Sequence, residues 1–263
     1  MQNNNKWWGD FEFSNNEIIS WKIGERQIAI KRCNFEWMVW NIETQNELNI
    51  PIQIQTNINE DEINSDVYSR HVLDKDIQSL SIEPSLADRA MIARPSVPLS
   101  IMPGQTIKMY ISTPIWFTAL LQNKSLPVFD VPFWRPSDTW FGPNTLTGDL
   151  CYSKYTDAKI NFDKLEKNSN RAITVISIKN NDKAALKVER INIPVPLLRL
   201  YCDSENKLWT DKINIIQKTE RGHPVSELRH SAPDNVAELT LVADSRITSS
   251  KESILASIKN LVS

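Results

Sequence analysis

The chain has 263 residues, enough for one large or two ordinary domains whose apolar cores need neither disulfides nor metals. Its 30 Lys and Arg and 32 Asp and Glu nearly cancel to a net charge of -2, so the overall positive charge typical of nucleic-acid-binding proteins is missing. The 14 Pro against 6 Gly, together with 9 Trp, favour an all-β fold, because Pro is typical of edge strands and turns and aromatic side chains suit half-buried pleated surfaces.

The beginning of the chain shows no export signal and no membrane anchor. Residues 1–10 contain Asn, Lys and Trp rather than a basic region followed by an apolar run. The longest apolar stretch, 114–121, is too short to span a bilayer. Cys33, Cys151 and Cys202 are far apart and odd in number, which predicts three buried thiols in a reducing compartment. We therefore expect a cytoplasmic protein with no integral membrane segment.

Short strands separated by turn residues are predicted for the N-terminal part of the chain. In the last of them, Trp37 and Val39 alternate with Met38 and Trp40, so both faces of that strand should be covered. The expected strands are 11–13, 18–23, 26–31 and 35–42. A core with one or two exposed rings is expected from the indoles of Trp7, Trp8, Trp21, Trp37 and Trp40.

Residues 43–69 differ in character, because they contain acidic side chains and no Lys or Arg before Arg70. Ile50, Ile52 and Ile54 interrupt the acidic run and predict one edge strand. The rest is expected to be an acidic, mobile loop exposed to solvent, as charge runs usually are.

Two tight turns are expected to form β-hairpins. Pro103 and Gly104 are typical of a turn, since Pro presets one turn dihedral and Gly accepts a positive one at the next position. The second hairpin is predicted between 171–180 and 184–193, across the turn residues 180–182.

The central and C-terminal segments also have the pattern of strands. Prolines cut 91–121 into short pieces, and within it the apolar side chains between 107 and 111 alternate with Lys108 and Tyr110. Further strands are expected at 197–202, 207–217 and 238–243, a spacing typical of a β-sandwich.

The predicted architecture is two packed antiparallel β-sandwich-like units, residues 1–165 and 166–263. Their boundary is expected near 163–170, where Leu165 is the only strongly apolar residue. At the end of the chain, a capping-box pattern and apolar residues on one helical face predict a short amphipathic helix over 250–262. That helix is expected to dock on the sandwich rather than to be offered to a partner.

Motifs for metal, nucleotide or nucleophilic chemistry are missing from the sequence. His71, His223 and His230 are isolated from one another and from the cysteines, so no metal site is expected. The 6 Gly never form a Gly-x-Gly pattern, and no Gly-x-Ser-x-Gly turn nominates a serine. Among the 32 acidic residues nothing selects a pair for glycoside hydrolysis. We therefore expect no cofactor and nominate no catalytic residue.

Residues 133–142 differ from ordinary scaffold, because they combine aromatic rings with a cation and an anion. The candidate ligand-binding residues are Trp134, Arg135, Asp138 and Trp140. A Trp face could stack a sugar ring, Arg135 could bind a carboxylate or phosphate, and Asp138 could accept hydroxyl protons. In the alternative interpretation, which we favour, the rings plug the junction between the two units while Arg135 and Asp138 form an ion pair.

Four phrases of the sequence, WGDFEF at 8–13, IMPGQ at 101–105, YISTPIW at 110–116 and DTWFG at 138–142, resemble a prokaryotic family of unknown function. The resemblance implies a small soluble β-rich protein without an assigned activity, and some members are encoded near small-conductance mechanosensitive channels. None of the phrases is a catalytic motif. The resemblance therefore transfers no functional residue.

Three functional hypotheses follow from the sequence. The leading one is a non-enzymatic cytoplasmic β-sandwich protein that acts by contact with another protein, with a membrane channel as a candidate partner. The second is a small-molecule or carbohydrate binding module that uses residues 133–142, which would be excluded if Trp134 and Trp140 were both fully buried. The third is a hydrolase of sandwich or jelly-roll type, which needs two carboxylates, or a Ser and a His, in one cleft.

Overall fold

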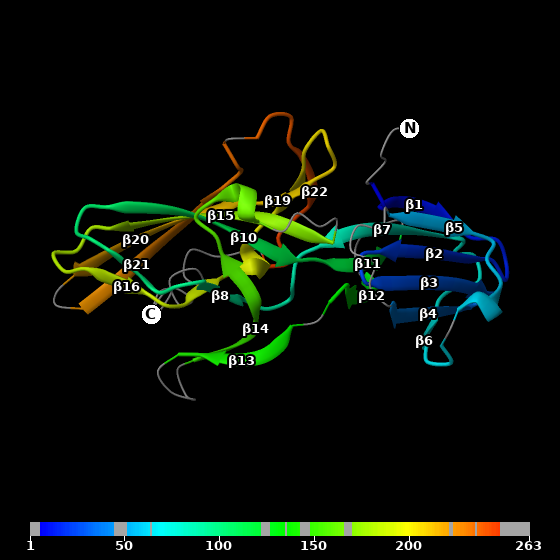
Figure 1. Ribbon diagram of the computed structural model, residues 1–263. Helices are drawn as coiled ribbons and strands as arrows, with labels where there is room; N and C mark the ends of the chain where they lie inside the picture. The colour runs from blue at the N-terminus through cyan, green and yellow to red at the C-terminus, as the bar shows by residue number, and fades with distance from the viewer. Residues whose placement is uncertain are drawn as a thin grey trace. The chain divides into compact units, whose positions relative to one another are not determined.

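The computed structural model describes residues 6–44, 52–63, 65–121, 127–134, 136–142, 148–165, 170–220, 223–234 and 236–247 (Figure 1). The elements in these residues are 22 strands and three single-turn 3-10 helices, so the predicted all-β fold is confirmed. Over the described part of the chain, none of the helices has the length and apolar character needed to cross a bilayer. The helix predicted over 250–262 lies outside the described residues.

The chain divides into two compact units, each assembled from separated stretches of sequence. Unit 2 takes strands from both sides of residue 165. The predicted division into residues 1–165 and 166–263 stays a prediction. Unit 1 comprises residues 1–85, 115–134 and 168–170, and unit 2 comprises residues 86–114, 135–167 and 171–263.

Unit 1 is built from two antiparallel sheets, as expected for a β-sandwich. The first sheet has the order β5-β2-β3-β4-β6, and the second has the order β1-β7-β11-β12. The strands of the first are β5 (Gln53–Thr56), β2 (Ile18–Ile23), β3 (Arg26–Cys33), β4 (Glu36–Glu43) and β6 (Ser69–Val72). Those of the second are β1 (Gly9–Glu12), β7 (Ser79–Ser85), β11 (Trp116–Leu120) and β12 (Pro127–Pro132).

Aromatic rings fill the core between these sheets. The buried indole of Trp7 stacks on Phe117 with ring centroids 5.5 Å apart, and Trp21 contacts Phe117 edge to face at 5.3 Å. Trp37 makes a similar contact with Phe13 at 5.0 Å. The expectation that most of the N-terminal indoles are core is therefore confirmed, since Trp7, Trp21, Trp37 and Trp40 are buried while Trp8 is half-buried.

The acidic segment covers the outer face of the first sheet. β5 is an edge strand paired with β2, which confirms the single edge strand expected there. Beyond it, Ile63 is buried after the short helix η1 (Glu60–Glu62) and packs in a cluster with Trp40, while Glu60 binds Lys31. Both faces of β4 are thus covered, as the alternation of its side chains predicts.

The central strand of unit 2 is β15 (Arg171–Asn180). It pairs antiparallel with β10 (Thr106–Pro114) and parallel with β19 (Leu208–Thr210) and β20 (Lys212–Glu220). Unit 2 is therefore mixed and not purely antiparallel, a difference from the expected architecture. The same sheet also contains β18 (Leu200–Cys202), β21 (His223–Ser231) and β22 (Thr240–Ala243).

Two smaller sheets complete unit 2. In the four-stranded sheet β13-β14-β8-β17, β13 pairs antiparallel with β14, and β14 pairs parallel with β8. The two-stranded sheet pairs β9 with β16. These strands are β8 (Met91–Pro95), β9 (Leu99–Ile101), β13 (Ser137–Phe141), β14 (Asp149–Ala158), β16 (Leu186–Val188) and β17 (Ile191–Ile193).

Both predicted turns of unit 2 are present, but both predicted hairpins are wrong. β9 and β10 flank the first turn, and β15 and β16 flank the second. In the described pairings, β9 pairs with β16 and β10 pairs with β15, so the strands of each turn pair with those of the other turn. The turns face each other: the Gly104 amide donates to the Asn180 carbonyl at 2.8 Å, and the Asn180 amide donates to the Gln105 carbonyl at 3.0 Å. The prediction failed because turn residues specify a change of direction and not the strand that becomes the partner.

The Asn180 side chain fixes this arrangement from a fully buried position. Its Nδ2 donates to the carbonyls of Ile101 and Ala184, both at 2.8 Å. Its Oδ1 accepts from the Asp182 amide at 2.9 Å. One side chain therefore joins the end of β9, the end of β15 and the loop that leads to β16.

We expect Asn180→Ala to lower the free energy of unfolding by about 2 to 4 kcal/mol, because it removes these bonds and leaves buried backbone groups without a partner. Urea denaturation followed by circular dichroism measures the effect. Asn181→Ala is the matched control, since Asn181 is exposed, and it should change the free energy by less than about 0.5 kcal/mol. Equal effects of the two substitutions would contradict the role given to Asn180.

Candidate functional site

The structure distributes the predicted ligand-binding residues over both units. Trp134 is half-buried in unit 1, next to Phe133 in the aromatic core. Arg135 lies outside the described residues. Asp138 and Trp140 lie in unit 2, two positions apart on β13 and therefore on the same face of that strand. Of the three candidate residues that the structure describes, these two lie together in one unit.

Asp138 is bound by an arginine that no local sequence pattern indicates. The Arg89 Nη1 lies 3.0 Å from Asp138 Oδ1, and its guanidinium carbon lies 5.4 Å from the centre of the Tyr152 ring. The Tyr152 hydroxyl in turn donates to Asp88 at 2.8 Å. Arg89 is therefore a cation beside Asp138, and the predicted ion pair of Arg135 with Asp138 stays a prediction because Arg135 lies outside the described residues.

Trp140 presents an exposed ring on the outer side of the β13–β14 hairpin. It is 40% exposed, and Leu150, its direct neighbour on β14, is 47% exposed. The ring lies against Gly148, where an added Cβ would be 2.2 Å from the indole nitrogen. Because neither Trp134 nor Trp140 is fully buried, the condition that would exclude the binding hypothesis is not met.

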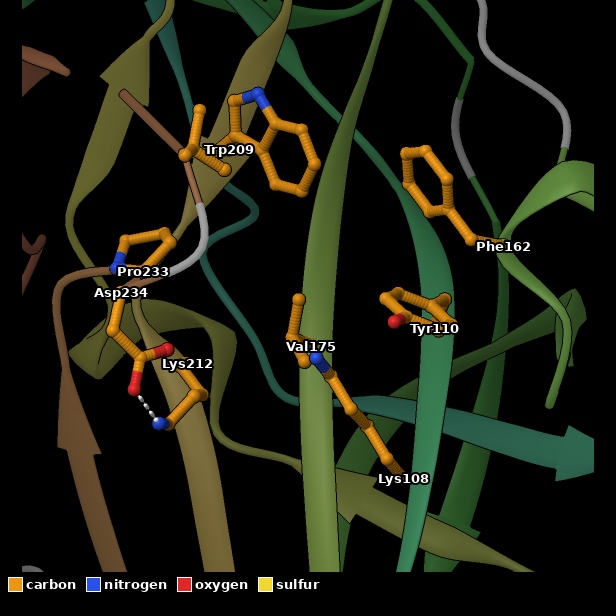
Figure 2. Close-up of a pocket in the computed structure, with 9 residues that line it drawn as sticks. Lys108, Tyr110, Phe162, Val175, Trp209, Lys212, Pro233 and Asp234 are labelled. Atoms are coloured by element: carbon orange, nitrogen blue, oxygen red, sulfur yellow. Dashed lines mark hydrogen bonds and ion pairs between the residues drawn. The ribbon is translucent and has the colours of Figure 1, made fainter. Parts of the chain in front are cut away.

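A pocket lies on one face of the large sheet of unit 2 (Figure 2). It has a volume of about 150 Å³. Tyr110 and Val175, directly paired across β10 and β15, form its base. Phe162, in the short helix η2 (Phe162–Lys164), has its ring centre 5.1 Å from that of Tyr110 and 5.9 Å from that of Trp209. The pocket is thus lined by three aromatic rings, of which Phe162 contacts the other two.

Charged side chains border this aromatic pocket. Lys108 extends from β10 with its ammonium 5.3 Å from the centre of the Tyr110 ring (Figure 2). Lys212 lies across the pocket and binds Asp234 at 2.5 Å. The hydrogen bond from Lys212 holds the pKa of Asp234 below its usual range, so this carboxylate is ionised at neutral pH. Pro233 and Val236 complete the lining.

A buried carboxylate, Asp211, organises the strands beside the pocket. Arg199 donates to it from the backbone amide at 3.1 Å and from the guanidinium at 3.0 and 3.2 Å. The Tyr201 hydroxyl donates at 3.0 Å, and the His230 Nδ1 lies 3.2 Å from the second oxygen. The side chain of Asp211 is fully buried, and a buried charge is stable only with charged or hydrogen-bonding partners. For Asp211 these partners come from β18, β21 and the segment before β18.

These contacts shift two pKa values in opposite directions. Burial alone would raise the pKa of Asp211, but the hydrogen bonds from His230 and Arg199 outweigh burial and lower the pKa to about 2. Burial, followed by the neighbouring negative charge of Asp211, raises the pKa of Tyr201 to about 12. Asp211 is therefore ionised and Tyr201 neutral throughout the physiological range, as expected of a structural charge cluster.

The described contacts do not assemble a complete catalytic set. Ser69 bonds His71 at 3.0 Å on β6, and the other described contact of that ring is with Phe129. His230 bonds Asp211 in unit 2. Among the described residues, His, Cys, Asp and Glu side chains form no cluster able to hold a metal ion. Cys33, Cys151 and Cys202 form no disulfide among the described residues, and Cys33 is only half-buried, which differs from the expectation.

Sequence reasoning missed most of the residues described above. Lys108 and Tyr110 carried a usable signal, since they alternate with apolar residues and so belong to the outer face of a strand. Arg199, Asp211 and His230 carried none, because their contacts join positions 12 and 19 residues apart. Phe162 lies directly before the segment 163–170, which the sequence analysis interpreted only as a boundary.

Comparison with known proteins gives one match. A family model described as "Protein of unknown function (DUF432)" matches residues 7–260, which is nearly the whole chain. No curated protein and no solved structure matches.

The low pKa of Asp211 predicts a pH dependence of stability. Its folded value of about 2 lies below the ordinary 3.8, so on acidification the unfolded state takes up the proton first and the contribution of Asp211 is lost as the pH falls through the folded pKa. We expect the wild type to lose about 1 kcal/mol more unfolding free energy than Asp211→Asn between about pH 5.5 and pH 3. Urea denaturation at each pH measures this difference, and parallel curves for the two proteins would refute it.

Proposed function

The chain belongs to the family of proteins of unknown function named DUF432, and we propose that it is a non-enzymatic cytoplasmic protein that acts by contact with another protein. The observation that carries this proposal is the exposed pair of Trp140 and Leu150. Large apolar side chains that lie together on the surface are typical of protein-binding sites, and Trp is enriched among the residues that contribute most to binding.

The position of this pair also supports a contact site. β13 is at the end of the strand order in its sheet, and edge strands are where partner chains add to a sheet. The ion pair of Arg89 and Asp138 lies on the face of β13 that carries Trp140, so an apolar centre has a charged border. Such an arrangement is common at interfaces. A membrane channel as the partner is supported only by the resemblance of the four sequence phrases.

We expect Trp140→Ser combined with Leu150→Ser to abolish recovery of a partner that co-purifies with the wild-type protein from native cells after cross-linking. The reason is the loss of the apolar centre, which typically costs at least about 2 kcal/mol of binding energy. Val97→Ser is the matched control, because Val97 is an exposed apolar residue of the same unit. If no partner is recovered reproducibly with the wild type, or if the double variant recovers it equally well, the proposal is wrong.

A second candidate function is a small-molecule or carbohydrate binding module at residues 133–142. The observation that favours it is the exposed indole of Trp140 beside the charges of Asp138 and Arg89. An exposed Trp face can stack a sugar ring while neighbouring carboxylate and guanidinium groups bond its hydroxyls. The leading and second candidates use the same surface, but they differ in the size of the ligand.

A thermal-shift screen of sugars, nucleotides and organic acids tests the second candidate. We expect a stabilising compound to raise the melting temperature of the wild type by about 3 °C or more at saturation, and to have no effect on Trp140→Ala. Val97→Ala is the control, because Val97 is an exposed apolar residue of unit 2 outside residues 133–142. A compound that stabilises the wild type and Trp140→Ala equally binds elsewhere, and that result removes this candidate.

A further inference from the structure

The pocket of unit 2 has the size of a single aromatic ring. Its volume is about 150 Å³, and an apolar protein cavity of about that volume binds benzene. Pockets for nucleotides and other drug-sized ligands are larger, about 300 to 1,000 Å³. The volume therefore favours a small occupant, of about the size of one aromatic ring.

The aromatic side chains that line the pocket favour a ligand with an aromatic ring. Phe162 is nearly parallel to Trp209, with an interplanar angle of 16°, and tilted by 59° from Tyr110. Aromatic rings prefer offset-stacked or edge-to-face contacts with other rings at such separations. The Trp209 nitrogen donates to Asp203 at 2.9 Å, which fixes the orientation of this indole. The aromatic rings that line the pocket are therefore already held in position without a ligand.

The charged side chains that line the pocket favour an anionic ligand. Lys212 binds Asp234 at 2.5 Å, and the charge of Asp234 also acts on Lys108, whose ammonium lies 5.3 Å from the centre of the Tyr110 ring. By formal charge the lining residues have one positive charge in excess. A carboxylate on the occupant would compensate that charge with a charge-assisted hydrogen bond from Lys108.

We infer that the pocket of unit 2 binds a small carboxylic acid that contains one aromatic ring, with the ring against Trp209 and Phe162 and the carboxylate at Lys108. This site is independent of the surface around Trp140, which involves different strands of the unit. No covalent step is implied: the site recognises one ring and one negative charge.

Titration of the full-length protein with benzoate tests the inference by calorimetry and by the NMR signals of the indole N–H groups, with the Trp209 signal assigned through Trp209→Phe. We expect saturable binding of benzoate and a shift of the Trp209 signal. Benzyl alcohol, which has the ring without the charge, and acetate, which has the charge without the ring, should each bind at least about tenfold more weakly. Absence of benzoate binding at about 10 mM ligand would overturn the inference.

Lys108→Gln should weaken benzoate binding about tenfold, because it removes the positive charge that the lining residues have in excess. Lys187→Gln is the matched control, an exposed lysine on β16 of the same unit, and it should leave binding unchanged. Equal binding of benzoate and benzyl alcohol by the wild type would overturn the role of charge even if Lys108→Gln failed to fold. Saturable binding without a shift of the Trp209 signal would place the ligand outside the pocket and overturn the inference.

Discussion

The register of β10 against β15 is the constraint on which the rest of unit 2 depends. Nine consecutive pairs join the two strands, from Thr106 opposite Lys179 to Pro114 opposite Arg171. This register turns Met109 and Ile111 toward the buried side together with Ile176, and it turns Tyr110 and Val175 to the side of the pocket. A slip by one residue would exchange the two faces and destroy both core and pocket. The buried Asn180 opposes such a slip, because its hydrogen bonds form only when the two turns face each other.

Unit 1 depends on a different constraint, the filling of a sandwich core by aromatic rings. The indole nitrogens of Trp7, Trp21 and Trp37 are buried without a hydrogen-bond partner among the described contacts, which is costly for any single group. The stacked and edge-to-face ring contacts around Phe117 offset part of that cost. The acidic segment also contributes to the burial of aromatic side chains, because its residue Ile63 packs in a cluster with Trp40.

The two groups of charges in unit 2 differ in how completely they are compensated. Asp211 is fully buried, and Arg199, Tyr201 and His230 satisfy it together, so its role in holding strands is explained by the structure. Lys108 lies at the border of an aromatic pocket, where a positive charge over a ring is only weakly stabilised. The contacts of Asp211 are explained by their contribution to the stability of the fold. The position of Lys108 is not explained in this way, and this contrast is the reason why we propose a ligand for the pocket and not for the Asp211 cluster.

The sequence by itself determined the all-β class, the two turns of unit 2, the edge strand in the acidic segment and the two covered faces of β4. These features depend on local dihedral preferences and on the period of two along a strand, which neighbouring residues express directly. Which strands pair was decided only by the tertiary structure. The strands that flank each turn pair with those that flank the other turn, so the hairpin predictions were wrong. The tertiary structure likewise decided that Arg89 binds Asp138 and that Phe162 meets Tyr110, because such contacts join residues that are distant in sequence and leave no local pattern. Of the candidate site, the sequence therefore indicated a strand on which Lys108 and Tyr110 alternate with apolar residues, and the packing of distant segments made their face a pocket.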